Sequence, residues 1–125
     1  NSLEVIILTV VKLFDSELKI MDIVWNKEPV SAKEISLIAA ETIGWNKNTT
    51  YTIIKKLLDK NALQRTEPNF ICTSLVQKAE IRKAETQSLI NKLYNGSKKA
   101  FFASFIDNDL TEDELEMLKK LIEKR

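Results

Sequence analysis

The sequence predicts a mostly α-helical protein in which a winged helix-turn-helix domain is followed by a helical arm. Only two of the 125 residues are Gly and only two are Pro, so long stretches can run as unbroken helix. Three amphipathic segments precede two short alternating segments around Pro68, which is the element order of a winged helix. The rest of the chain shows helical periodicity with narrow apolar stripes.

The first two predicted helices form the base of the winged helix. Asp15 can cap the first helix, which runs to about Asn26, and Pro29 breaks the chain after it. Ser31 caps the second helix and Gly44 stops it. The apolar stripes comprise Leu18, Met21, Ile23, Val24 and Trp25 in the first helix, and Ile35, Ile38, Ala39 and Ile43 in the second.

The third predicted helix, from about Asn46 to Lys60, opens with residues that are weak helix formers. Asn and Thr each cost up to about 0.7 kcal/mol against Ala in a helix. One side of this helix is apolar and can pack on the first two helices; it comprises Thr50, Ile53, Ile54, Leu57 and Leu58. The other side displays short polar groups and Lys, which hydrogen-bond to base edges and phosphates, so poor helix formers are tolerated there.

For this reason the sequence predicts that the third helix enters the major groove of double-stranded DNA, with a further contact from the wing. Lys55 and Lys56 are assigned to phosphates rather than bases, because Lys acts as a flexible point charge. The predicted DNA-binding residues are Asn46, Lys47, Asn48, Thr49, Tyr51, Thr52, Lys55, Lys56 and Arg65.

Simpler explanations exist for several of these residues. A polar helix side is often only solvated, and Asn46 or Thr49 can be no more than a helix cap. Tyr51 can lie against the protein surface, and a lone wing Arg is often merely solvated. A winged helix can also be a protein-interaction module. Salt separates the two kinds of partner, because binding through several phosphates weakens steeply as salt rises.

The charges are distributed unevenly, although the net charge of the chain is only +1. Residues 45–65 carry five basic residues and one acidic residue, a net charge of +4. Residues 76–106 carry six basic and two acidic residues, again +4, whereas residues 107–125 carry four basic and seven acidic residues, or −3. Two basic segments before an acidic end indicate a polyanionic partner and a separate role for the tail.

The predicted arm contains helices over about 75–93 and 97–106, and a last helix that opens with a capping box at Thr111–Glu114. Asn95-Gly96 separates the first two. The apolar stripe of the arm needs a partner, and a second copy of the chain is the simplest one, because two-fold dimers dominate homo-oligomers. The predicted dimerisation residues are Leu89, Ile90, Leu93, Phe101, Phe102, Phe105, Ile106, Leu115, Leu118, Leu121 and Ile122.

The chain is therefore divided into an N-terminal extension of unknown role (1–12), a winged helix DNA-binding domain (13–74) and a helical dimerisation arm (75–125). The apolar run near the N-terminus is much shorter than the ~20 residues of a membrane span. It also lacks the basic start and the cleavage site of a signal peptide, so no membrane insertion is predicted. The single Cys72 excludes an internal disulfide and fits the reducing cytoplasm.

The residue types argue against an enzyme. The chain has no His, which is the commonest general base, and it has no phosphate loop, dinucleotide-binding glycine pattern or nucleophile elbow. The carboxylates at Glu112–Glu116 fit helix capping and solvation. We expect no catalytic residues, no metal site and no cofactor.

Several segments resemble the penicillinase repressor family, which also contains the methicillin-resistance repressor and the copper-transport operon repressors. The resemblance covers residues 13–124 and rests on SELKIMDIVW (16–25), GWNKNTTYTIIKKLLDKNAL (44–63), SLVQKAE (74–80), INKLYNGS (90–97) and FIDNDLTEDELEML (105–118). It implies a homodimeric repressor on a palindromic operator near β-lactam resistance genes.

The resemblance also carries residue roles. Relatives contact DNA at the positions that match Asn48, Thr49, Tyr51, Thr52 and Lys56. Asn48 stands where relatives carry Lys, and Tyr51 stands where they carry Gln or Arg. The wing is about two residues shorter and lacks the usual basic tip. These differences leave the operator sequence open.

In antibiotic-responsive relatives, a protease cuts before a Phe of the dimerisation arm, and the matching bond here joins Ser104 and Phe105. The resemblance thus implies a sensor protease as a partner. The paired Cys-x-Cys motifs of the copper-responsive branch are absent here, and soft Cu(I) needs such thiolates. A repressor of an unrelated operon without a proteolytic switch is the alternative, because the sequence names neither the regulated gene nor the inducing signal.

Overall fold

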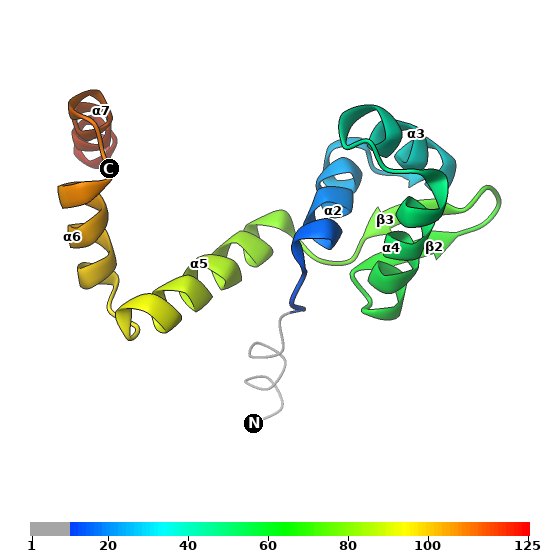
Figure 1. Ribbon diagram of the computed structural model, residues 1–125, viewed down its shortest axis with the longest axis horizontal. Helices are drawn as coiled ribbons and strands as arrows, with labels where there is room; N and C mark the ends of the chain where they lie inside the picture. Colours follow the sequence, from blue (N-terminus) through cyan, green and yellow to red (C-terminus); the bar gives the residue numbers. More distant parts are fainter. Residues whose placement is uncertain (1–10) are drawn as a thin grey trace. The chain divides into compact units, whose positions relative to one another are not determined.

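The computed structural model describes residues 11–125. The predicted N-terminal extension therefore lies outside the described residues, apart from its last two positions. Figure 1 shows the elements in order, which are α2 (Asp15–Lys27), β1 (Val30–Ser31), α3 (Ala32–Thr42), α4 (Lys47–Asp59), β2 (Leu63–Thr66), β3 (Ile71–Ser74), α5 (Lys78–Tyr94), α6 (Lys98–Asn108) and α7 (Glu112–Glu123). The predicted fold class, a mostly helical chain that begins with a winged helix, is confirmed.

The chain separates into two compact units, of which the first ends at Arg82 and the second spans Lys83–Arg125. The division falls within α5, so that helix begins in the winged-helix unit and ends in the arm unit. Its Ile81 side chain, at the end of the first unit, is buried in the winged-helix core.

The winged-helix core lies where α2, α3 and α4 meet one face of the small sheet (Figure 1). Its fully buried members come from every element of the unit and include Ile20, Met21, Val24, Val30, Ile35, Ala39, Ile54, Leu57, Leu63 and Cys72. Leu13, ahead of α2, is buried with them. The predicted apolar stripes thus point inward, although Leu18 and Trp25 in the first and Ile38 and Ile43 in the second are only half-buried.

The sheet has three antiparallel strands in the order β1-β3-β2. In its register, Cys72 lies between Val30 on one side and Arg65 on the other. The hairpin of β2 and β3 was predicted, but β1 was not. A strand of two residues is too short to show the alternating pattern on which such a prediction depends.

The start of α2 differs from the prediction. Phe14 occupies the N-cap position, and Asp15 is the first helical residue instead of the cap. The Phe14 backbone N–H donates to Oε1 of Glu17 over 2.8 Å. The side chain that closes this helix end therefore comes from within the first turn.

Glu17 is a buried carboxylate, with 1% of its surface exposed. Its Oε1 atom lies 2.7 Å from Nζ of Lys60, which also donates to the Lys12 carbonyl over 3.1 Å. The same ammonium lies 4.5 Å from the ring centroid of Phe14. These contacts join the end of α4 to the start of α2.

In the arm unit, the breaks between helices fall where the sequence predicts them. Asn95 and Gly96 have φ angles of 50° and 81°, and the Gly96 N–H donates to the Ile90 carbonyl. Ser97 caps α6 by accepting from the Ala100 N–H. Thr111 and Glu114 exchange both bonds of the capping box that opens α7.

We expect Lys60→Met to destabilise the protein by about 2–3 kcal/mol, because it leaves the Glu17 carboxylate buried without its cation. Glu17→Gln should cost less, about 1 kcal/mol, because Gln can still accept from Phe14 and the Lys60 ammonium is partly in contact with water. Urea unfolding at fixed protein concentration measures the difference. Lys55→Met, on the exposed side of the same helix, is the control and should stay within about 0.5 kcal/mol of wild type. A larger loss in Glu17→Gln than in Lys60→Met would contradict the assigned roles.

Candidate nucleic-acid interface

Helix α4 has one buried side and one exposed polar side, as the sequence predicts. Thr50, Ile53, Ile54 and Leu57 are buried against the rest of the winged helix. The exposed side carries Lys47, Asn48, Thr49, Thr52, Lys55 and Lys56. Because the apolar side fixes the rotation of the helix, these six side chains are held toward solvent together.

The first turn of α4 is closed by its own side chains. Oδ1 of Asn46 accepts from the Thr49 N–H over 2.8 Å, so the Asn46 acceptor serves as the helix cap. The Thr52 hydroxyl donates to the Asn48 carbonyl over 2.9 Å. The Asn48 and Thr52 side chains are exposed, so a base edge could meet them.

Tyr51 is half-buried and lies against the wing. Its ring meets the ring of Phe70 edge-on, with centroids 6.0 Å apart and an interplanar angle of 89°. Nζ of Lys47 lies 5.7 Å from the centroid of the Tyr51 ring. The structure therefore groups Tyr51 with Lys47 and the wing turn.

Arg65, on β2, is held by two neighbours. Its guanidinium carbon lies 3.6 Å from the centroid of the Phe70 ring, and its Nε donates to Oε1 of Glu67. The hydrogen bond from Arg65 lowers the pKa of Glu67, and the Phe70 N–H lowers it further. Arg65, the predicted wing contact, is thus paired with the Glu67 carboxylate.

These pairings change the charge argument. Of the five basic residues in 45–65, Lys60 is paired with Glu17, and Arg65 is paired with Glu67. Lys47, Lys55 and Lys56 supply the exposed positive charge of α4 itself. The segment is positive, but three cations carry most of the positive charge that faces solvent, and the exposed Asp59 at the end of α4 offsets part of it.

Phe70 and Glu67 belong to this surface, and the sequence prediction missed both. They flank the Pro68-Asn69 turn, and their side chains reach back to Tyr51 and Arg65. An aromatic residue directly after a polar turn was the available signal, because an exposed turn otherwise favours small polar residues.

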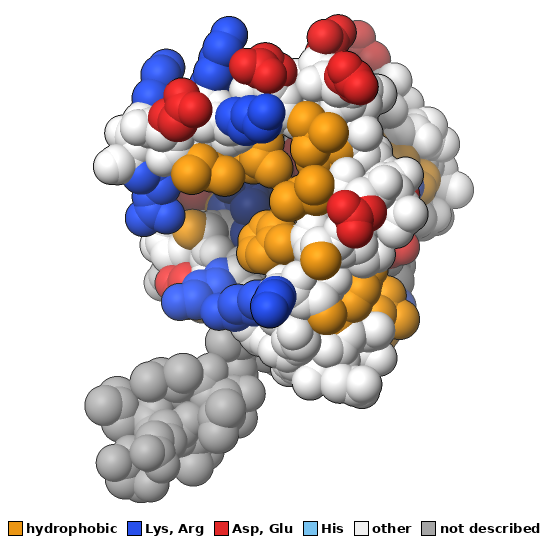
Figure 2. All heavy atoms as spheres, turned by 90° about the vertical axis from the view of Figure 1, so that its left-hand side faces the viewer, with side chains coloured by type: hydrophobic (Ala, Val, Ile, Leu, Met, Phe, Trp, Pro, Cys, Tyr) orange, Lys and Arg blue, Asp and Glu red, His pale blue; other side chains and the backbone are white. Residues whose placement is uncertain are grey.

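The arm unit carries the predicted dimerisation residues on a largely uncovered apolar surface. Figure 2 looks onto the side that bears α6 and α7, and it shows apolar side chains gathered there with charged side chains about them. A hollow of about 310 Å³ in the arm unit is lined by Phe101, Phe102, Phe105, Ile106, Leu110, Glu114, Met117, Leu118 and Leu121. Neither α6 nor α7 has a fully buried residue.

The predicted dimerisation residues differ in exposure. Ile90 is buried within the single chain, with 3% of its surface exposed. Phe101, Ile106, Leu115 and Leu118 are half-buried. The remainder are exposed, and they are Leu89, Leu93, Phe102, Phe105, Leu121 and Ile122.

The Ser104–Phe105 bond lies inside α6. Ser104 is half-buried, and its Oγ lies 3.4 Å from the Tyr94 hydroxyl. Phe105 packs against Phe101 with ring centroids 5.8 Å apart. The predicted cleavage site is thus helical, with one residue on the apolar side of the arm.

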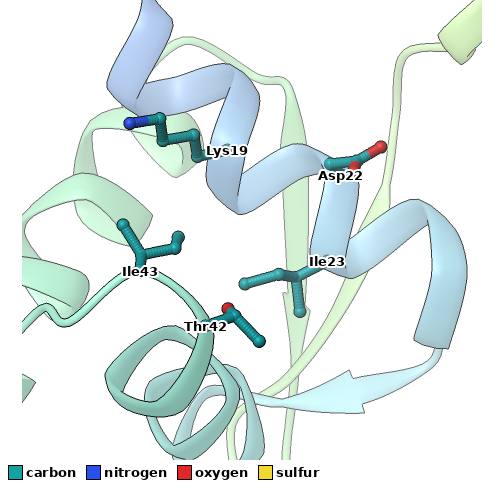
Figure 3. A pocket seen from close by; sticks show the side chains of 5 residues that line it. All are labelled: Lys19, Asp22, Ile23, Thr42 and Ile43. Atoms are coloured by element: carbon teal, nitrogen blue, oxygen red, sulfur yellow. The ribbon is translucent and has the colours of Figure 1, made fainter.

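A second hollow, of about 400 Å³, lies beside α2 at the end of α3. Figure 3 shows its lining, in which Ile23 of α2 faces Thr42 and Ile43, with Lys19 and Asp22 earlier in α2. Asp22 is paired with Lys78 over 2.9 Å. None of the predicted DNA-binding residues lines this hollow, which is an open surface depression.

Other site classes gain no support from the described part of the chain. Among residues 11–125, no three His, Cys, Asp or Glu side chains are grouped as a metal site would require. Burial raises the pKa of the Cys72 thiol, and the charge of Arg65 opposes this only in part, so the sulfur is a poor nucleophile. Every described helix is too short or too polar to span a bilayer.

Comparison with known proteins gives one family. Residues 13–124 match the penicillinase repressor family. The methicillin resistance regulatory protein MecI of Staphylococcus aureus strain N315 is 29% identical over 117 residues, covering 91% of this chain and 95% of the relative. The penicillinase repressor of Bacillus licheniformis is 24% identical over 115 residues, covering 90% of each chain.

A solved structure supports the fold. The solution structure of the Bacillus licheniformis BlaI monomeric form in complex with the blaP half-operator matches with a TM-score of 0.52 and 22% identity. The match covers 58% of this chain and 90% of that one. The family match confirms the sequence resemblance, and it also confirms that the chain is a regulator and not an enzyme. The chain therefore belongs to the penicillinase repressor family of winged-helix transcriptional repressors.

Proposed function

We propose that this protein represses transcription as a homodimer that binds a palindromic operator through α4. The observation that carries this proposal is the exposed polar row of α4, opposite a largely buried apolar side. In winged helix-turn-helix proteins such a helix enters the major groove, which is wide enough to admit it. The blaP half-operator bound by the BlaI relative supports the same kind of ligand here.

Within this proposal, base contacts and phosphate contacts fall to different residues. Asn48 can pair bidentately with adenine, and the Thr52 methyl group can meet a thymine methyl. Lys55 and Lys56 act on phosphates, which hold the helix in register but carry no sequence information. The free N–H groups at the start of α4 favour a phosphate as well.

The arm supplies the second half of the proposed mechanism. A second copy of the chain would cover the uncovered apolar side chains of α6 and α7, because a two-fold interface uses the same patch on both subunits. Each winged helix would then occupy one half-site. Dimerisation makes the second half-site contact effectively intramolecular, which raises the affinity for the full site.

The relatives are named for penicillinase and methicillin resistance, and this supports control of β-lactam resistance genes here. Release of the operator would follow cleavage at Ser104–Phe105 by a sensor protease. The protease would reach this bond when the subunits separate, because α6 has no buried residue in a single chain and a lightly packed helix opens locally at low cost. A repressor of this kind works at the chromosome, and we place it in the cytoplasm.

Lys56→Ala should weaken binding to every duplex by a similar factor, because it removes a phosphate contact. The plot of log affinity against log salt should become less steep by about 0.9. Fluorescence anisotropy at several salt concentrations measures both, on a duplex selected by the wild-type protein from random sequences and on an unrelated duplex. A wild-type affinity for DNA that does not change with salt concentration would contradict the proposed phosphate contacts.

Asn48→Ala should instead relax the choice of sequence. The preference of the protein for the selected duplex over the unrelated one should fall by about 1–3 kcal/mol, which is the contribution of one bidentate base contact. The two duplexes are compared at one salt concentration, with Lys56→Ala as the control that lowers both affinities equally. An unchanged sequence preference in Asn48→Ala would show that Asn48 makes no specific base contact.

Removing residues 95–125 should give a monomer whose affinity for a palindromic site is lower by a factor of about 10² or more. Its affinity for an isolated half-site should match that of the full chain, because α4 is untouched. Sedimentation velocity gives the oligomeric state, and gel shifts give the two affinities. A shortened chain that remains dimeric would contradict the role of α6 and α7.

A further inference from the structure

Four side chains form a continuous row from the start of α4 to the wing. Lys47 lies over Tyr51, Tyr51 meets Phe70 edge-on, and Phe70 carries the guanidinium of Arg65 on its face. We call this row, Lys47–Tyr51–Phe70–Arg65, the cation–aromatic ladder. Both ends of the ladder are cations with exposed side chains, and both rings are partly buried.

Phe70 is the fixed point of the ladder. Its φ angle is 52°, in a region that a bulky side chain rarely occupies, and Asn69 before it has a φ of 74°. Strained backbone of this kind persists only where its surroundings hold it, and it is common at functional sites.

The surroundings that hold Phe70 come from three parts of the winged helix. Its N–H donates to Oε2 of Glu67 over 3.3 Å, and its carbonyl accepts from the Ala32 N–H, at the start of α3, over 2.9 Å. Its ring is held between Tyr51 and Arg65. The wing turn is thereby tied to both α3 and α4.

We propose that the cation–aromatic ladder fixes the wing relative to α4 and so holds Lys47 and Arg65 as a pair of phosphate-binding cations. Arg65 acts through its terminal guanidinium nitrogens, since its bond to Glu67 uses Nε. Tyr51 and Phe70 are then positioning residues, and Tyr51 reads no base. This inference rests on the proposed function, since it concerns how the same surface meets DNA.

The ring of Tyr51, and not its hydroxyl, is the part that the ladder uses. Tyr51→Phe keeps the ring and should leave both the affinity and the sequence preference unchanged. Tyr51→Leu removes the ring and should weaken binding to the selected and the unrelated duplex alike, by about fivefold, the equivalent of one lost cation–aromatic contact. Its salt dependence should become less steep, as the two end cations lose their fixed positions.

A measurement without DNA tests the ladder itself. In Tyr51→Leu, the heteronuclear NOE of the backbone amides at residues 66, 67 and 69–71 should fall, because the wing turn loses its attachment to α4. Leu37→Ala removes an exposed apolar side chain from α3, away from the ladder, and should leave these values unchanged. If Tyr51→Leu does not fold, Arg65→Gln replaces it in the binding assay. Arg65→Gln should weaken binding to both duplexes by a similar factor, and its affinity should depend less steeply on salt concentration.

The outcomes separate this inference from the proposed function. If the wild-type chain binds no duplex at low salt, both fail. If the wild-type chain binds but Tyr51→Phe changes the ratio of the two affinities, Tyr51 is a base contact and the ladder proposal alone is overturned. Unchanged affinity and unchanged NOE values in Tyr51→Leu would overturn it as well.

Discussion

The packing of the apolar side of α4 is the constraint on which the rest of this molecule depends. Ile54 and Leu57 are completely buried, and Thr50 is buried beside them. Burying such side chains stabilises the fold by about 1.5–3 kcal/mol each, which is more than the poor helix propensity of the opposite side costs. The helix can therefore carry Asn48 and Thr52 where Ala or Leu would make a better helix. One side of α4 therefore stabilises the fold, and the opposite side provides the polar surface.

The two ends of α4 are anchored in different ways. At its start, Asn46 caps the helix and the cation–aromatic ladder extends to the wing. At its end, Lys60 pairs with the buried Glu17 of α2. In the proposed function α4 enters a groove as a rigid body, and both attachments favour this, because a loosely held element would lose entropy on binding.

The helices, their order and most of their ends could be predicted from the sequence, because the relevant signals are local. Ser31, Asn46, Ser97 and Thr111 each act as the helix cap that short-range rules favour. The apolar spacing of α4 gave its buried side correctly. The two-residue strand β1 was not predicted, because its pairing with a strand about 40 residues later leaves no local pattern in the sequence.

The ion pair between Glu17 and Lys60 could not be predicted from short-range rules. Nothing near Glu17 in the chain indicates that Lys60 neutralises it, since the two are 43 positions apart. The same holds for the Tyr51–Phe70 contact, which depends on the direction of the wing turn. The assignment of individual base contacts stays a prediction, because it depends on the partner as much as on this chain.

The thin packing of the arm has a consequence for how such a regulator responds to its own abundance. Helices α6 and α7 bury no residue completely in a single chain, so in the proposed homodimer their order is tied to subunit concentration by mass action. When synthesis slows and copies become scarce, pairing and local order decline together. Scarcity would then empty the regulatory site and also leave the dissociated chains open to degradation. Derepression would therefore rise more steeply, as the amount of protein falls, than dilution alone would cause.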